Sequence, residues 1–262
     1  MTLDSPSAHA ATVAALYRYP VKGFTPQRIE RAELEEGGWF PGDRLYAVEA
    51  GPSGFDPDAP AHISKMRFAV LARMPQVAAI NTYYDVETGR IVARRDGLPN
   101  FAAMLEEAAG REAFAQWLEQ ALKDVPHLPL KVLRAPPSHR FMDSRSGFVS
   151  IINLASLREL ESRIGRGLHP LRFRANLYVE GWAPWAELEM EGARLAVGGA
   201  VLEGIKRIDR CVATHVDPYT AERDADVIGA LRANYGHIDC GLYARIVQGG
   251  AVADGDPVQA AA

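Results

Sequence analysis

Cysteine is scarce in this sequence, and long apolar stretches are missing. The 262 residues include only Cys211 and Cys240, separated by 28 residues, so the sequence has no Cys-x-x-Cys motif and no disulfide framework. This cysteine usage is typical of a reducing compartment. No apolar run approaches the roughly 18 residues that a membrane-spanning helix needs. The N-terminal segment MTLDSPSAHAATVAALYRYP has no positive charge before its short alanine-rich part, unlike a signal peptide. We therefore expect a cytoplasmic protein without a membrane partner.

An excess of positive charge is also absent. The chain has 33 acidic and 29 basic residues, a net charge of −4. Nucleic-acid binding depends on an excess of Lys and Arg on one face, so nucleic acid is not an expected partner. Any small anion must then be bound by a local group of basic residues. The histidine spacings of metal sites are missing, as are GxSxG and Walker A motifs, which weighs against zinc enzymes, serine hydrolases and P-loop proteins.

The sequence does contain many short strand patterns separated by Gly and Pro. Residues 76–85 and 90–97 flank Val-Glu-Thr-Gly and predict a hairpin. Helical spacing predicts helices at 111–124, 154–164 and 224–234, the second with a Ser or Asn cap. Further strands are predicted within residues 12–23, 27–36, 37–51, 128–135, 174–181, 193–208 and 240–258. This pattern, in a chain long enough for a full core, predicts a β-rich α+β fold and not a doubly wound sheet.

Cys211 directly follows Arg210 and allows two interpretations. Free cysteine is among the residues most often buried, so composition favours a small structural side chain. Alternatively, Cys211 is a thiolate that holds a ligand, and a guanidinium nearby would favour the charged form. In an extended segment, however, adjacent side chains point to opposite faces. From the residues alone, both interpretations stay open.

Several basic residues lie where an anion could be bound. Lys22 lies in a Pro-Val-Lys-Gly turn after a strand, Arg44 lies where a turn meets the next strand, and Arg174 lies two residues before Asn176. Arginine offers a planar fork of donors that matches phosphate oxygens, whereas lysine offers a point charge. Each of them alone is typical of a solvated surface residue. The candidates for a phosphate site are Lys22, Arg44, Arg172, Arg174 and Arg210.

Five segments, in order, resemble the MOSC domain proteins, which are named for the C-terminal domain of molybdenum cofactor sulfurase. These are LYRYPVKG, GDRLYAV, RFRANLYVEG, RCVATHVDPYTAERD and GDPV, and the resemblance runs from about Val13 to Val258. It implies a MOSC β-barrel domain at 136–260, packed with a smaller N-terminal α/β region, the MOSC N-terminal β-barrel-like region, at 12–135. Within the family, the chain is most similar to the mitochondrial amidoxime-reducing component and its bacterial relatives.

The resemblance implies a molybdenum-cofactor oxidoreductase that reduces N-hydroxylated compounds such as hydroxylamino purines or amidoximes. Cys211 would be the molybdenum ligand, and Asp217 would orient the substrate, although an Asp-Pro turn is the simpler interpretation of Asp217. Gly23 replaces the serine that is frequent in the family, and Asp209 adds a negative charge where a small polar residue or proline is usual. The residues implied to contact the cofactor, molybdenum-molybdopterin, are Lys22, Gly23, Arg44, Ser146, Arg174, Asn176, Asp209, Arg210 and Tyr243.

The resemblance also sets expectations about partners. No four-cysteine run for an iron–sulfur cluster is present, so electrons are expected from a separate protein of the ferredoxin, cytochrome b5 or flavin reductase type. We expect a monomer. An alternative from another class is a carrier of molybdenum cofactor or of persulfide sulfur without turnover. Nothing in the chain resembles the pyridoxal-phosphate-dependent domain that loads sulfur in sulfurases, and binding of pyridoxal phosphate is not expected.

Overall fold

The computed structural model describes residues 11–126, 128–146 and 148–261. Their largest sheet closes into a barrel of seven strands, because β1 pairs with β15 on one side and with β10 on the other. All neighbours are antiparallel except the pair of β9 and β10. Around the barrel the strands are β1 (Ala11–Arg18), β10 (Leu177–Glu180), β9 (Val149–Asn153), β13 (Asp239–Gln248), β12 (Ala200–Asp209), β11 (Arg194–Val197) and β15 (Pro257–Ala260).

Apolar side chains on alternate residues of the strands fill the barrel interior. Along most of β12, buried residues alternate with partly exposed ones, as the pleat of a strand with one covered face requires. The apolar side chains that point inward form one continuous core, to which β1 contributes Val13 and Leu16. The barrel therefore needs the first strand of the chain, although its other six strands all come from residue 149 onward.

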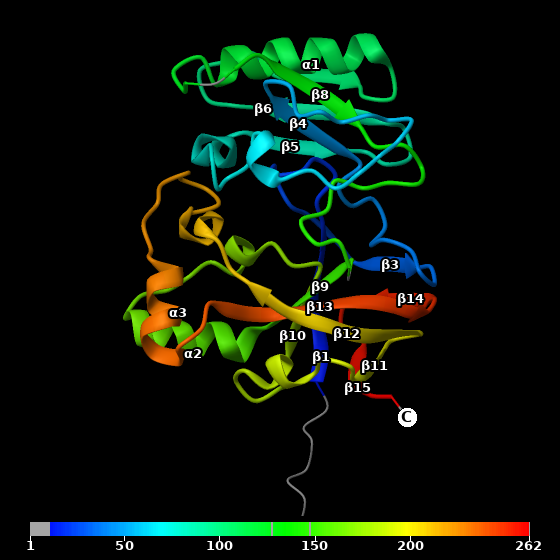
Figure 1. The fold of residues 1–262 in the computed structure, drawn as a ribbon, viewed down its shortest axis with the longest axis vertical. Helices are drawn as coiled ribbons and strands as arrows, with labels where there is room; N and C mark the ends of the chain where they lie inside the picture. The colour runs from blue at the N-terminus through cyan, green and yellow to red at the C-terminus, as the bar shows by residue number, and fades with distance from the viewer. Residues whose placement is uncertain (1–10, 127, 147, 262) are drawn as a thin grey trace, which may run out of the picture.

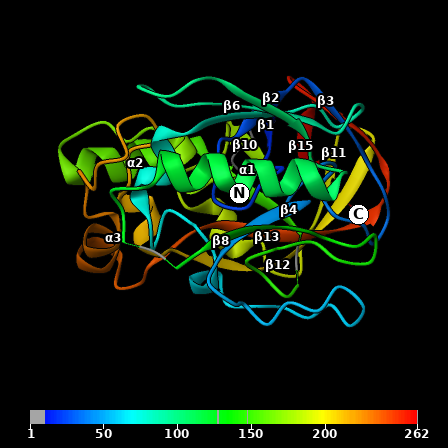
Figure 2. The same cartoon turned by 90° about the horizontal axis from the view of Figure 1, so that it is seen from above.

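The N-terminal half adds a second layer above the barrel (Figure 1). This layer contains the pair β4 (Tyr46–Ala50) and β8 (Leu130–Arg134), and a sheet of β5 (Asn81–Tyr84), β6 (Arg90–Arg94) and β7 (Phe101–Met104). Helix α1 (Ala108–Ala121) covers the layer, and Figure 2 shows it lying across the top of the molecule. The layer has a core of its own that includes Tyr46, Phe114 and Leu118.

Two further helices pack on one flank of the barrel (Figure 1). Helix α2 (Leu154–Ile164) begins at Asn153, whose side chain accepts a hydrogen bond from the Ala155 N–H, and α3 (Val227–Tyr235) is capped in the same way by Asp226. Both helices end at a glycine in the left-handed conformation. The short strand β2 (Gln27–Ile29) extends the sheet beside β1, and β3 (Arg31–Leu34) pairs with β14 (Gly250–Ala253).

The β-rich α+β fold is confirmed, and so are the predicted bounds of α2 and its asparagine cap. The predicted hairpin is present, with Tyr84 opposite Ile91, but its first strand begins only at Asn81 because Pro75–Ala79 forms a 3₁₀ turn. Helix α1 begins three residues earlier than predicted. The first strand ends at Arg18 because Pro20 has no N–H for strand pairing. No helix in the described ranges is long and apolar enough to cross a membrane.

Gly110, in the first turn of α1, tests how tightly this helix packs. A methyl group there would lie 1.9 Å from the carbonyl oxygen of Met104 at the end of β7. Alanine usually stabilises a helix by about 1 kcal/mol over glycine, but this clash should reverse the sign. We expect Gly110→Ala to lower the free energy of unfolding by about 1–3 kcal/mol, measured by urea denaturation.

The matched control is Gly167→Ala, where a methyl group would have only Glu161 Oε1 within contact distance, at 3.9 Å. That substitution should change stability by less than about 0.5 kcal/mol. Equal effects of the two substitutions would contradict the packing argument.

Candidate functional site

Cys211 lies in a cleft lined by residues from both halves of the chain. Two adjoining cavities of about 40 and 80 Å³ make up this cleft, which we call the Cys211 cleft. The residues that line both cavities are Arg44, Lys65, Asp143, Arg174, Cys211 and Ala213.

The backbone holds the Cys211 thiol at the cleft wall. Cys211 is extended and precedes the 3₁₀ turn Val212–His215, and its carbonyl oxygen accepts hydrogen bonds from the N–H and the hydroxyl of Thr214. The side chain is half-buried. By contrast, Cys240 is fully buried, and burial raises its pKa to about 12. Full burial at Cys240 fits the structural interpretation that composition suggests, whereas the half-buried Cys211 lines a cleft.

Lys65 is the charged partner of Cys211. It begins the 3₁₀ turn Lys65–Arg67, and its Nζ lies 3.2 Å from the Cys211 Sγ. Burial lowers the pKa of Lys65, but the neighbouring Cys211 and Asp143 outweigh burial and raise it above its ordinary value. The cleft therefore places a persistent ammonium group beside the sulfur.

Lys22 and Asp143 form a second charged contact in the cleft. The loop after β1 turns at Pro20, and Gly23 follows with φ +88°, where an added methyl group would lie 2.7 Å from the Ala69 carbonyl oxygen. This turn buries Lys22, whose Nζ donates to the carboxylate of Asp143 and to the Phe141 carbonyl oxygen at 2.8 Å. Burial lowers the pKa of Lys22. The Asp143 side chain is 43% exposed, and although partial burial would raise its pKa, Lys22 and the other cations hold that pKa well below its usual range.

Arg44 and Arg174 meet at one aromatic ring. Both guanidinium groups pack against the buried Tyr19 ring, each 4.5 Å from the ring centroid. Both residues have positive φ angles, 47° and 52°, which only a few per cent of residues other than glycine adopt. Arg44 also pairs with Asp43, and Arg174 donates to the Phe24 carbonyl oxygen at 2.9 Å. Surrounding structure thus holds two strained arginines in fixed positions, which is a frequent feature of binding sites.

Arg210 enters the cleft with a free donor. Its Nε donates to the Cys240 carbonyl oxygen at 2.6 Å and its Nη1 to that of Phe173 at 2.9 Å, while Nη2 is buried and has no hydrogen-bond partner among the residues that the structure describes. The lack of a side chain at Gly241 leaves space for the Arg210 guanidinium, because an added methyl group would lie only 2.9 Å from Nη2. Although Arg210 precedes Cys211 in the chain, its long side chain reaches the cavity that Cys211 lines.

The charges of the cleft favour an anion. Its lining includes six cationic side chains and only two carboxylates, those of Asp143 and Asp209. Arg172 is already neutralised by Asp217 and Asp224, although its Nε has no hydrogen-bond partner in the described part of the chain. The six cationic residues are Lys22, Arg44, Lys65, Arg172, Arg174 and Arg210.

The cleft brings together most of the residues that the sequence singled out. Ser146, Asn176 and Asp217 are not among its lining residues. The residues that line it with Cys211 are Lys22, Gly23, Arg44, Arg174, Asp209, Arg210 and Tyr243.

The three remaining residues have other contacts. Asn176 is buried, accepts from the N–H and hydroxyl of Ser150, and donates to Asp43, so it supports the pair that holds Arg44. The Ser146 carbonyl oxygen accepts from a hydroxyl group two residues before it. Asp217 Oδ1 accepts from two N–H groups of its own turn, at 2.9 and 3.0 Å, and Oδ2 pairs with Arg172. The contacts of the Asp217 carboxylate are therefore those of an Asp-Pro turn residue, as the simpler interpretation expects.

Sequence reasoning missed Lys65 and Asp143. Lys65 follows a Pro- and Gly-rich loop, and Asp143 lies in a segment without strand or helix, so neither carries a local signal. Only the folded chain brings both within reach of residues far away in the sequence, Cys211 and Lys22.

Comparisons with known proteins match nearly the whole chain. The family model of the MOSC domain matches residues 138–259, and that of the MOSC N-terminal beta barrel domain matches residues 10–125. Mitochondrial amidoxime-reducing component 1 of Homo sapiens is 29% identical over 242 residues, covering 80% of this chain and 67% of that protein. Molybdenum cofactor sulfurase of Caenorhabditis briggsae is 32% identical over 134 residues, which are 50% of this chain but only 18% of the sulfurase.

A solved structure covers the chain as well. The YUAD protein from Bacillus subtilis aligns over 95% of this chain and 94% of its own, with 16% identity and a TM-score of 0.45.

Asp143→Asn tests the contact with Lys22. The folded-state pKa of Asp143 lies below its unfolded value, so the carboxylate stabilises the fold at neutral pH, and this contribution is lost as the pH falls. At pH 7 we expect the substitution to lower the free energy of unfolding by about 1–3 kcal/mol, between the values for exposed and buried pairs. The difference from wild type should narrow below about pH 4.

Urea denaturation at pH 7 and pH 3 measures both effects. Glu33→Gln is the control, because Glu33 forms an exposed pair with Arg31 and should contribute less than about 1 kcal/mol. An Asp143→Asn difference that stays constant with pH would show that its charge is not what stabilises the fold.

Proposed function

Because the chain belongs to the MOSC domain family, with a MOSC N-terminal beta barrel domain at residues 10–125 and a MOSC domain at 138–259, we propose that it is a molybdenum-cofactor-dependent oxidoreductase. In this proposal it reduces the N–O bond of small N-hydroxylated compounds, such as hydroxylamino purines or amidoximes. The similarity to mitochondrial amidoxime-reducing component 1 over 80% of the chain supports the proposal. The observation that carries it is the half-buried Cys211 thiol in a cleft with an excess of fixed cations.

The residues of the cleft fit a metal that is bound mainly by its own cofactor and needs only one ligand from the protein. The described residues contain no group of three or more His, Cys, Asp or Glu side chains that could hold a metal ion by themselves. The cleft instead offers one thiol, and thiolate suits metals that prefer soft ligands. Cys211 would therefore be the protein ligand of a molybdenum held by the sulfur atoms of its pterin.

The cations fit a phosphate-bearing cofactor. Arginine forks bind phosphate oxygens in pairs, and the free Nη2 of Arg210 is a buried donor that needs an acceptor. Arg44 and Arg174 are held in place by Tyr19, so little conformational entropy is lost when they bind an anion. The residues that would hold the cofactor are Lys22, Arg44, Arg174, Arg210 and Tyr243.

The bound cofactor would supply the two-electron chemistry that removes oxygen from an N–O bond. The overall reaction consumes two electrons and two protons and releases an amine or amidine and water. The chain itself would orient the cofactor through the fixed arginines and keep the charge of the Cys211 thiolate balanced through the Lys65 ammonium. The electrons would come from a separate donor protein of the ferredoxin, cytochrome b5 or flavin reductase type.

The first test is the metal content. Protein purified from a host that makes molybdenum cofactor should contain molybdenum and release pterin on denaturation, in a ratio near one to one. Cys211→Ser should lose most of the molybdenum because serine lacks the soft sulfur donor. Cys240→Ala is the matched control, because Cys240 is fully buried and does not line the cleft, and the substitution keeps the backbone carbonyl that Arg210 contacts, so it should leave the metal in place. A wild type without metal and pterin would overturn the cofactor assignment, and a fully loaded Cys211→Ser would overturn the ligand assignment.

The second test separates an enzyme from a carrier. Loaded wild type should convert an aryl amidoxime or a hydroxylamino purine to the amidine or amine with a chemically reduced viologen as electron donor. Arg174→Gln should lower cofactor content and turnover together, because Arg174 is assigned to hold the cofactor and not to react. Full loading without turnover of either substrate would favour the carrier.

A further inference from the structure

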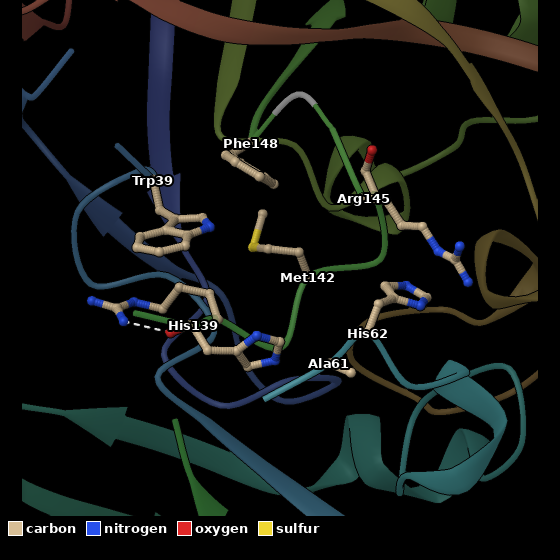
Figure 3. A pocket seen from close by; sticks show the side chains of 9 residues that line it. Trp39, Ala61, His62, His139, Met142, Arg145 and Phe148 are labelled. Atoms are coloured by element: carbon tan, nitrogen blue, oxygen red, sulfur yellow. Dashed lines mark hydrogen bonds between the residues drawn. The ribbon is translucent and has the colours of Figure 1, made fainter. Parts of the chain in front are cut away.

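A larger cavity of about 420 Å³ lies beyond the Cys211 cleft (Figure 3). None of its nine lining residues lines the cleft. We call it the Trp39 pocket, and its volume lies within the range of sites for small organic ligands. The lining residues that matter here are Trp39, His62, Arg140, Met142, Arg145 and Phe148.

One side of the Trp39 pocket is an aromatic wall. The rings of Trp39 and Phe148 lie 5.7 Å apart, centroid to centroid, and Figure 3 shows the Met142 side chain extending toward them. The guanidinium of Arg140 covers the Trp39 ring at 4.9 Å. Aromatic rings and a methionine thioether favour contact with a flat ring system, which gains dispersion and stacking energy there.

The opposite side of the pocket carries Arg145, and among the described residues no Asp or Glu lines the pocket. The second arginine of the lining, Arg140, lies on the aromatic wall. Arg145 is exposed, and within residues 11–126, 128–146 and 148–261 its side chain has no hydrogen-bond or ion-pair partner. Figure 3 shows its guanidinium pointing toward His62, away from the aromatic wall. An anionic group placed there could pair with this guanidinium without displacing a carboxylate of the described chain.

We propose that the Trp39 pocket binds a planar aromatic anion, a fused or heteroaromatic ring with a carboxylate or a phosphate group. The ring packs against Trp39, Phe148 and Met142, and the anionic group meets Arg145. Both parts of the pocket are needed to specify this ligand. The aromatic wall favours a planar ring, and the guanidinium favours a negatively charged group.

The pocket shares a wall with the Cys211 cleft. Met142 and Ser144 line the pocket, whereas Asp143 between them lines the cleft and pairs with Lys22. His62 Nε2 also lies 3.4 Å from the Asp143 carbonyl oxygen. A ligand in the pocket therefore contacts the same chain segment that carries the partner of Lys22. The binding proposal does not depend on molybdenum or on the proposed reaction.

Isothermal titration calorimetry of the full chain, with three matched probes, tests the proposal. The probes are 2-naphthoate, 2-naphthyl phosphate and the uncharged 2-naphthamide. We expect at least one anion to bind about tenfold more tightly than the amide, the effect of one charge-assisted hydrogen bond. The ratio of the two anion affinities identifies the preferred anionic group.

Arg145→Gln should remove this preference. Affinity for the anions should fall to that of the amide, while affinity for the amide stays unchanged. Arg194→Gln is the matched control, an exposed arginine on β11 outside the pocket, and it should change neither. Phe148→Ala should weaken the binding of all three probes about tenfold, with thermal unfolding as the check on folding.

Cys211→Ser should bind the probes as wild type does, which separates this site from the cleft and from the cofactor proposal. Four results would overturn the pocket assignment: no binding at millimolar probe, equal affinity of wild type for anions and amide, equal effects of Arg145→Gln and Arg194→Gln, or loss of binding in Cys211→Ser.

Discussion

The buried ring of Tyr19 connects the parts of the cleft that are far apart in the sequence. The backbone N–H of Tyr19 donates to Asp43, and its hydroxyl donates to the Ala175 carbonyl oxygen at 2.9 Å. The guanidinium groups of Arg44 and Arg174 pack against its ring. Burial raises the pKa of this phenol well above its ordinary value, so it stays neutral and keeps its proton for that hydrogen bond. The positions of these two arginines, which supply two of the six positive charges of the Cys211 cleft, depend on this one side chain.

Local signals in the sequence were sufficient for many of the regular elements. Helix α2 follows from apolar spacing and from an asparagine at its start, and the hairpin of β5 and β6 follows from two alternating segments around Val-Glu-Thr-Gly. Strand β7 was not predicted, because Phe-Ala-Ala-Met has no clear alternation, and it is stabilised mainly by pairing with β6. Tertiary pairing of this kind cannot be read from a four-residue segment.

The candidate site followed from the sequence only in part. Lys22, Arg44 and Arg174, which the sequence motifs singled out, all line the Cys211 cleft, and each lies at a turn that the local sequence marks. The charged and polar residues that contact the site from elsewhere in the chain could not be read from local sequence. Lys65 and Asp143 meet the cleft through contacts that span 146 and 121 residues, and Asn176 serves Asp43 and not the cavity. That Cys240 is buried and Cys211 only half-buried likewise became known from the fold and not from the sequence.

The carboxylate of Asp143 is a counterion for Lys22 that is covalently part of the chain. Lys22 is neutralised in the absence of any ligand, so an arriving anion must displace a group held by the chain. A tethered competitor acts at an effective concentration of about millimolar or higher, and simple dissolved anions at lower concentration compete with it poorly. A ligand with several attachment points can displace it. For the proposed cofactor, the cleft would therefore discriminate by the number of simultaneous contacts and not by charge alone.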